Sequence, residues 1–380
     1  MQSYGRTSVQ EFLGDFVVFR NLVPVDGRLP SLDDVREEVG VAAGVTPRKS
    51  EPAYAHAIVA MLEAARRVDP PGAALERLIY VGDTRMNDGT AFANIATAGG
   101  WPGRAFIASE KTEPCPPEIV RVAEDTASAL FLADRWADLS QFEQFCEDQD
   151  FRIDEHTVIL VDLDKTTVGA RGRNDHVINR ARVEAVQRTV GELLGEDFDE
   201  AAFQTAYHAL NQSEFHPFTA DNQDYLAYIC LILGSGLYRF EPLAERVQEQ
   251  RLKTFGAFID EVNARSNELH PPLQQIHRRI YQRVEAGDPT PFKAFRYNEY
   301  RATVERMGCL DDNAPVAQLL ASEIVITQEV RQAALRWRAA GALLFGLSDK
   351  PDEASIPTEE LGCEGFLPIH QVETHAVGAG

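Results

Sequence analysis

The segment Val158-Ile-Leu-Val-Asp-Leu-Asp-Lys-Thr166 constrains the fold of this chain most. Four apolar residues run directly into two aspartates, Asp162 and Asp164, that are separated by one residue. A short continuous apolar run of this kind is typical of a strand buried on both faces in a parallel sheet. Because side chains alternate along a strand, both carboxylates are expected to point the same way from its carboxyl end. In open α/β sheets that end lines the ligand-binding crevice.

Two further segments have the same design. The apolar run Leu78–Val81 leads into Asp83, with Asp88 five residues further on, and the apolar run Ala342–Leu347 leads into Ser348. A single Asp after an apolar run is ordinarily a turn residue or a helix cap. Three such runs together favour a shared site, because parallel strands of one sheet meet at one crevice. Carboxylates forced together repel one another, so a divalent cation is expected among them.

The length of 380 residues exceeds the usual size of a single hydrophobic core and predicts two domains. Residues 175–335 show helical periodicity without a convincing β pattern. We therefore predict an α/β core domain with a parallel sheet over residues 1–168 and 336–380, and a helical domain over residues 169–335. An insertion at that place would emerge beside the crevice and could cover it. The alternative is a domain that serves only packing or dimerisation.

Hydrophobic spacing also predicts individual elements. Strands are expected near residues 16–19, 77–82, 105–108, 157–162 and 342–347. Helices are expected over residues 51–67, 117–133, 139–147, 222–233 and 328–340. Residues 1–45 show little pattern and are interpreted as a segment that completes the edge of the sheet.

The charge of the chain limits its partners. The net charge is −22, which disfavours binding to nucleic acid or to anionic membranes. No apolar run approaches the roughly 20 residues that span a membrane, and the polar start lacks the apolar core of a signal peptide, so we expect a cytoplasmic protein. An anionic substrate needs local cations. Lys49 and Lys350 are the candidates, whereas Arg85, Arg171 and Arg173 are interpreted as solvated surface charges.

The two acidic segments resemble motifs of the haloacid dehalogenase (HAD) superfamily of hydrolases. Asp162-Leu-Asp-Lys-Thr166 matches the family's first motif, DxDx[TV], which follows an apolar strand. Gly82-Asp-Thr-Arg-Met-Asn-Asp88 fits the longer form of its fourth motif, an acidic pair spaced GDxxxxD. These two matches are the specific ones.

The second and third motifs are weaker matches. Leu347-Ser348 resembles the second, a Ser or Thr that ends another strand. Lys49 resembles the third, a lysine in a Lys-Pro-x-Pro context before a helix, with Ser50 in place of the first proline. Lys350 is a competing candidate, and Lys49 is favoured because the Ser-x-Lys-Pro turn around Lys350 is familiar after the second motif.

The motifs run in the order third, fourth, first, second, whereas the family runs from first to fourth. A circular permutation gives this order and leaves the site intact, because spatial arrangement rather than chain order builds a site. The resemblance implies an α/β fold: a three-layer, Rossmann-like HAD core with a parallel sheet. It also implies a large, mostly helical cap inserted between the first and second motifs.

The resemblance implies a Mg²⁺-dependent phosphatase that hydrolyses a small phosphorylated metabolite. Asp162 is expected to attack phosphorus and form an aspartyl-phosphate. Asp164 is expected to protonate the leaving oxygen and then to deprotonate the hydrolytic water. Dehalogenase members of the family lack an acidic residue at the Asp164 position, so its presence favours phosphoester chemistry.

The resemblance also assigns ligands. The expected Mg²⁺ ligands are Asp162, Asp83, the main-chain carbonyl of Asp164 and, directly or through a water, Asp88. The residues expected to bind the phosphoryl group are Thr166, Ser348 and Lys49.

Two other functions fit the same residues. A phosphotransferase or phosphomutase uses the same covalent step and passes the phosphoryl group to a hydroxyl instead of water. A noncatalytic binding or regulatory protein could keep the fold, although all the expected catalytic side chains are present. No GxGxxG or P-loop pattern occurs, so neither a dinucleotide nor an ATP cradle is inferred. The sequence indicates neither the natural substrate nor the oligomeric state.

Overall fold

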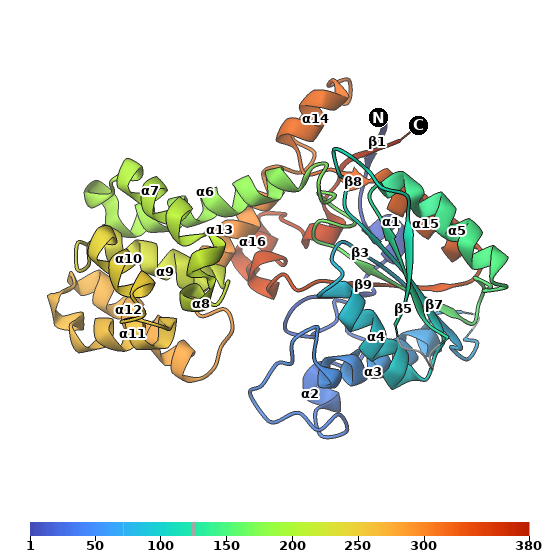
Figure 1. Cartoon of the computed structure of the whole chain (residues 1–380), viewed down its shortest axis with the longest axis horizontal. Coiled ribbons are helices and arrows are strands. Elements are labelled where there is room, and N and C mark those ends of the chain that lie inside the picture. Colours follow the sequence, from blue (N-terminus) through green and yellow to red (C-terminus); the bar gives the residue numbers. More distant parts are fainter. Residues whose placement is uncertain (71, 123–126, 380) are drawn as a thin grey trace. The chain divides into compact units, whose positions relative to one another are not determined.

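The computed structural model describes residues 1–70, 72–122 and 127–379, and the chain divides into two compact units (Figure 1). The sheet unit comprises Met1–Arg180 with Thr303–Gly380, and the helical unit comprises Ala181–Ala302. The helical unit is thus shorter than the expected range 169–335. Residues 303–335 belong to the sheet unit because they include the short strand β8 (Ile326–Thr327), which pairs there.

The sheet unit is built around a seven-stranded sheet, which confirms an α/β fold with a mostly parallel sheet. In spatial order its strands are β2 (Val17–Val18), β9 (Leu343–Leu347), β7 (Thr157–Asp162), β3 (Arg77–Gly82), β4 (Gly103–Ala108), β6 (Ala129–Ala133) and β5 (Glu118–Arg121). All neighbours are parallel except β5, which runs antiparallel to β6. β7 and β9 are buried along their whole length, as continuous apolar runs predict.

A second sheet of three strands gathers the two ends of the chain. Its order is β1 (Gln2–Thr7), β10 (Thr374–Gly378) and β8. β10 pairs antiparallel with β1 and parallel with β8. The first residues of the chain therefore contribute to both sheets, β1 to this one and β2 to the edge of the larger one.

The helices of the sheet unit cover both faces of the large sheet (Figure 1). The helices that cover it include α3 (Pro52–Val68) and α4 (Asp88–Gly99) on one face and α5 (Leu139–Asp148) and α15 (Gln328–Ala339) on the other. The other α-helices of the unit are α1 (Gln10–Leu13), α2 (Leu32–Val35), α14 (Val316–Ser322) and α16 (Glu359–Cys363). Because side chains alternate along a strand, neighbours face opposite layers. Tyr80 on β3 shares a buried cluster with α3 and α4, whereas Phe106 on β4 contacts Phe142 of α5.

The helical unit has a hydrophobic core of its own. Its helices, of which the first and last begin or end just outside it, are α6 (Asp175–Leu194), α7 (Glu200–Leu210), α8 (His216–Thr219), α9 (Gln223–Gly234), α10 (Phe240–Gln248), α11 (Phe255–Ala264), α12 (Pro271–Glu285) and α13 (Lys293–Val304). Leu226, Phe258 and Val262 are among its buried residues. Within the described residues, no helix of the chain is both long enough and apolar enough to cross a membrane.

The helix expected over residues 117–133 is wrong. The described parts of this range form β5 and β6, which pair with each other, and β6 also pairs with β4. A short apolar run such as Ala129–Ala133 does not distinguish strand from helix by itself. Here β4 offers an edge with which β6 pairs, and this pairing favours a strand. Residues 123–126 lie outside the described residues.

Candidate active site

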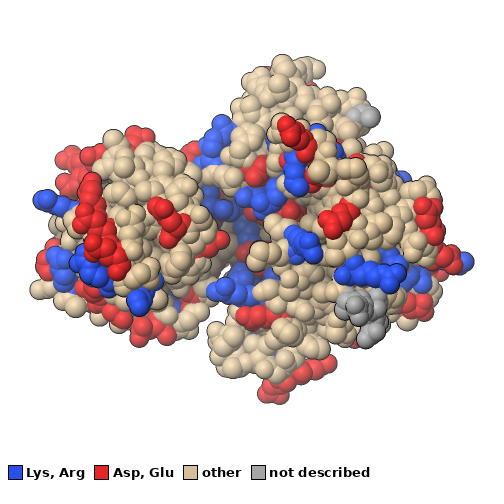
Figure 2. All heavy atoms as spheres, viewed as in Figure 1, with Lys and Arg blue, Asp and Glu red and all other residues tan. Residues whose placement is uncertain are grey.

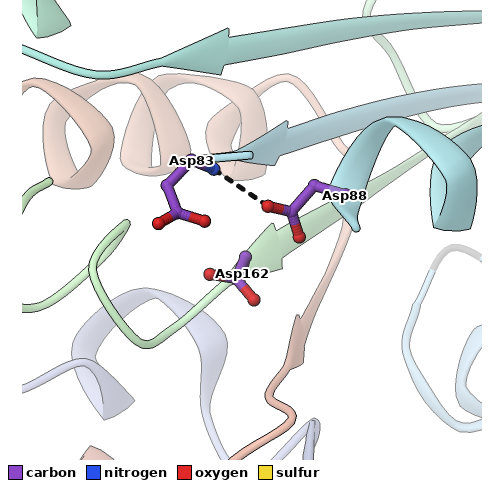
Figure 3. Close-up of side chains that lie close together, drawn as sticks. All are labelled: Asp83, Asp88 and Asp162. Atoms are coloured by element: carbon purple, nitrogen blue, oxygen red, sulfur yellow. Dashed lines mark hydrogen bonds between the residues drawn. The ribbon is translucent and has the colours of Figure 1, made fainter. Parts of the chain in front are cut away.

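The carboxyl ends of three adjacent strands bring together residues that are far apart in the sequence. Asp162 ends β7, Asp83 follows β3 and Ser348 follows β9, and β7 lies between the other two strands. Carboxylate oxygens of Asp83, Asp88 and Asp162 lie within 4.8 Å of one another. Figure 3 shows these carboxyl groups directed toward a common centre, with Asp88 coming from the start of α4.

Lys49 joins this cluster from the loop before α3. Its Nζ donates to Asp162 Oδ1 at 2.6 Å and to Asp88 Oδ1 at 2.7 Å. All three side chains are buried. Burial alone would lower the pKa of Lys49, but the charges of Asp162 and Asp88 outweigh it and raise that pKa well above its ordinary value. Burial also raises the pKa of Asp162, and Lys49 opposes this rise.

Asp88 organises the loop between β3 and α4. Its Oδ2 accepts from the main-chain N–H of Asp83 at 3.1 Å, and from the N–H and hydroxyl of Thr84 at 2.9 Å each. Its Oδ1 accepts from the Tyr80 hydroxyl at 3.0 Å as well as from Lys49. Although burial opposes it, Lys49 and these donors hold the pKa of Asp88 below its ordinary value. Asp88 thus fixes the backbone that carries Asp83.

Asp83 is paired with an arginine. The Arg171 Nε donates to Asp83 Oδ2, and the Asp83 side chain is only 8% exposed. Burial and the nearby charge of Asp88 raise the pKa of Asp83 to about 7, and Arg171 opposes the rise. The interpretation of Arg171 as a solvated surface charge is therefore wrong.

Arg173 is not a surface charge either. Its side chain is 4% exposed and forms ion pairs with Glu110 and Glu329, each at 2.9 Å. Burial alone would lower the pKa of Arg173. The two carboxylates compensate the cost of burying the guanidinium, and the pKa is raised as a result. Arg85, in contrast, is exposed as expected.

The loop after β7 positions the side chain of Asp162. The Thr166 hydroxyl donates to Asp162 Oδ2 at 2.9 Å, and the Thr167 hydroxyl donates to the Asp162 carbonyl at 2.7 Å. Lys165 has a φ of 64°, so the loop turns through a left-handed conformation. Asp164 lies in this loop, partly buried, and forms an isolated bridge with Val168.

The loop after β9 carries Ser348 and Lys350. Ser348 is 2% exposed, and its hydroxyl accepts from the main-chain N–H of Lys350 at 3.1 Å. The Lys350 Nζ lies 3.5 Å from the Thr303 hydroxyl. Of the two candidate lysines, Lys49 is thus the one that donates hydrogen bonds to both Asp162 and Asp88.

Tyr80, Thr84 and Arg171 belong to the site but were not singled out for it from the sequence. Thr84 follows Asp83 directly, so the acidic motif could have pointed to it. Tyr80 lies inside an apolar run, and its hydroxyl reaches Asp88 only because α4 packs over that face of β3. Arg171 approaches Asp83 across 88 residues of sequence, which no local pattern indicates.

The donor set suits a hard divalent cation. Oxygen ligands from several carboxylates are what Mg²⁺ prefers. Lys49 and Arg171 supply two positive charges to three carboxylates, so the ionised cluster retains negative charge. On the face of the molecule that Figure 2 shows, acidic and basic side chains are both present.

Comparisons with known proteins add no relative. No protein-family model matches the chain, no curated protein matches it and no solved structure matches it. The interpretation of the site therefore depends on the residues and geometry described above.

Proposed function

We propose that this protein is a Mg²⁺-dependent phosphatase with the HAD motifs in circularly permuted order, acting on a small phosphorylated metabolite. The proposal depends on one observation: residues from distant parts of the chain lie together at the carboxyl ends of three adjacent strands. They are Asp162, Asp83, Lys49 and Ser348. Their order in the chain differs from the family's, and their spatial grouping is what the chemistry requires.

Asp162 is the nucleophile in this proposal. One of its carboxylate oxygens forms a bond to phosphorus while the bond from phosphorus to the leaving oxygen breaks. Asp164 gives its proton to the leaving oxygen. Water then attacks phosphorus, Asp164 takes a proton from that water, and the Asp162–phosphorus bond breaks to release inorganic phosphate.

The positive groups of the site offset charge on the phosphoryl oxygens. Lys49 lies against Asp162, so its ammonium is placed beside the point of attack. Ser348 offers a buried hydroxyl at the end of the neighbouring strand. Asp162 and Asp83 would hold Mg²⁺, which when bound neutralises phosphoryl charge, and Asp88 keeps Asp83 in place.

The helical unit is proposed to be the cap. Its sequence is inserted between the first motif at Asp162 and the second motif at Ser348, the place of the family's first cap insertion. A cap excludes water from the reaction and supplies contacts to the leaving group.

The direct test is hydrolysis of p-nitrophenyl phosphate by wild type, Asp162→Asn and Asp154→Asn, with and without Mg²⁺. Asp154 pairs with Arg77 near the start of β7, so its variant is a matched control at the opposite end of the strand. We expect Mg²⁺-dependent turnover that Asp162→Asn lowers at least about a thousandfold and that the control retains. Turnover that survives Asp162→Asn would refute the assignment. Transfer of phosphate to an added alcohol would indicate a phosphotransferase instead.

A further inference from the structure

A small cavity lies beside Asp164 within the sheet unit. Its walls are largely aliphatic and include Leu163, Ile178 and Ile324. The polar side chains among its lining residues are Asp164, Thr303, Lys350 and His370. The enclosed volume is about 10 Å³, which is room for roughly one water-sized group. A group that enters must therefore be compact, and the polar side chains decide which chemistry it needs.

His370 lines this cavity, and its ring carries an unsatisfied acceptor. The side chain is buried, and its Nε2 lies 3.2 Å from Asp15 Oδ1. Burial lowers the pKa of His370, although Asp15 opposes this, so the ring is neutral near pH 7. A carboxylate can only accept, so the ring proton resides on Nε2 and Nδ1 carries a lone pair. That Nδ1 is buried and has no hydrogen-bond partner among the described residues.

The ring is held in this orientation by its surroundings. Asp15 Oδ1 also accepts from the side-chain amides of Gln10 at 2.9 Å and Gln371 at 3.0 Å. These donors keep the pKa of Asp15 low against partial burial. Leaving a buried acceptor unpaired is unfavourable, so a ligand that donates a hydrogen bond to Nδ1 gains from removing that cost.

The cavity combines this acceptor with donors. The Lys350 ammonium offers N–H donors, and Thr303 offers a hydroxyl 3.5 Å from it. A carboxylate would leave His370 Nδ1 without a donor. An ammonium ligand could accept nothing from Lys350 or Thr303, and it would lie beside the Lys350 charge, which Asp164 offsets only in part. A hydroxyl can both accept from Lys350 or Thr303 and donate to His370, so it is the compact group that complements the lining.

We propose that this cavity binds one hydroxyl group of the substrate's alcohol part, with His370 as the specificity-determining acceptor. The inference rests on the proposed function, in which Asp164 donates its proton to the leaving oxygen. Because Asp164 also lines the cavity, a hydroxyl bound there would lie beside the residue that protonates the leaving oxygen. The preferred substrates are then phosphomonoesters of polyols rather than of simple alcohols.

The test compares glycerol 1-phosphate with propyl phosphate, which lacks the hydroxyls. In wild type we expect kcat/KM to favour glycerol 1-phosphate by about tenfold to a hundredfold, the range for one buried hydrogen bond. His370→Phe removes the acceptor and should bring the ratio close to one. His370→Gln retains an acceptor oxygen and should preserve most of the preference. His156→Phe, at a half-exposed position at the start of β7, is the control that should leave the ratio unchanged.

Asp15→Ala provides a variant with little risk to folding, because the Asp15 side chain is 42% exposed. It removes the oxygen that accepts from His370 Nε2 and so no longer fixes the proton there, and the ratio should fall without loss of the ring. Hydrolysis of p-nitrophenyl phosphate separates the two proposals. If wild type hydrolyses that ester but shows no preference for the polyol, or if His370→Phe keeps the preference, the cavity assignment is overturned and the phosphatase stands. If wild type hydrolyses none of the three esters, both are overturned.

Discussion

At the scale of single residues, Lys49 has the most demanding position. It is a buried ammonium between two buried carboxylates, Asp162 and Asp88. Breaking such a group by removing one partner leaves uncompensated charge, and this costs far more than losing an exposed ion pair. The residue has both a structural and a proposed catalytic role, and the two can be measured separately.

Lys49→Met is expected to lower the free energy of unfolding by about 3–5 kcal/mol without Mg²⁺, because Asp162 and Asp88 lose their cation. Added Mg²⁺ should restore part of that loss. Lys111→Met is the control, since Lys111 pairs with Asp134 while 59% exposed and should change stability by less than about 1 kcal/mol. Denaturant titration with and without Mg²⁺ measures both. An equal loss in the two variants would contradict the buried pairing.

Asp83 predicts the pH dependence of metal binding. Its pKa is raised to about 7, so below pH 7 the metal-free protein carries a proton on this carboxyl. Mg²⁺ must displace that proton, and its apparent affinity should fall by about tenfold per pH unit below 7 and level off above it. Calorimetric titration between pH 5.5 and about 8 tests this. Asp83→Asn should bind more weakly and lose the slope, and a slope that persists in the variant would assign the proton elsewhere.

At the scale of elements, the turn from β3 to α4 couples the sheet to the site. A Cβ on Gly82 would lie 2.6 Å from the Cβ and Cγ of Asp88, so only glycine permits Asp88 to approach. At the other end of the sheet, a Cβ on Gly103 would lie 2.5 Å from the ring of Phe92. An added Cβ would be similarly crowded at both glycines, but only at Gly82 would it press on a residue of the site.

Gly82→Ala and Gly103→Ala are therefore a matched pair. Both should lower the free energy of unfolding by about 1–3 kcal/mol through overpacking. Only Gly82→Ala should also weaken Mg²⁺ binding and turnover, because it displaces Asp88 and with it the loop that carries Asp83. Thermal unfolding and phosphatase assays on both variants measure this. A comparable loss of turnover in Gly103→Ala would mean that general destabilisation, not the turn, explains the effect.

At the scale of the whole molecule, each unit has its own core. The buried cluster of the helical unit lies entirely within Ala181–Ala302, and the cluster around α3, α4 and the strands lies entirely within the sheet unit. Separate cores allow separate cooperative transitions.

Leu226→Ala in the helical unit and Leu160→Ala on β7 should each cost about 2–5 kcal/mol, because both side chains are fully buried. Calorimetry should resolve two transitions, with each variant lowering only the one that belongs to its unit. A single transition that both variants lower equally would show that the two cores unfold as one.

Local sequence patterns were sufficient to predict the strands that carry the site. The runs that end at Asp162, at Gly82 before Asp83 and at Leu347 before Ser348 are buried strands close to the expected bounds. A short, continuously apolar segment favours a parallel strand that is covered on both faces. The polar residue that follows it then lies at the carboxyl end of the strand. The helices at 51–67 and 139–147 follow equally well from local spacing.

The other features of the fold and of the site could not be predicted locally, because they depend on partners distant in the chain. β5 and β6 are strands and not a helix because β4 had an edge to pair. Arg173 is buried and Arg171 is partly buried against carboxylates that no local pattern joins to them. Packing alone brings the Tyr80 hydroxyl to Asp88 and leaves one nitrogen of His370 without a partner among the described residues. Local periodicity indicates which face of a segment is apolar. Which polar groups come into contact is determined by long-range packing, which local periodicity does not contain.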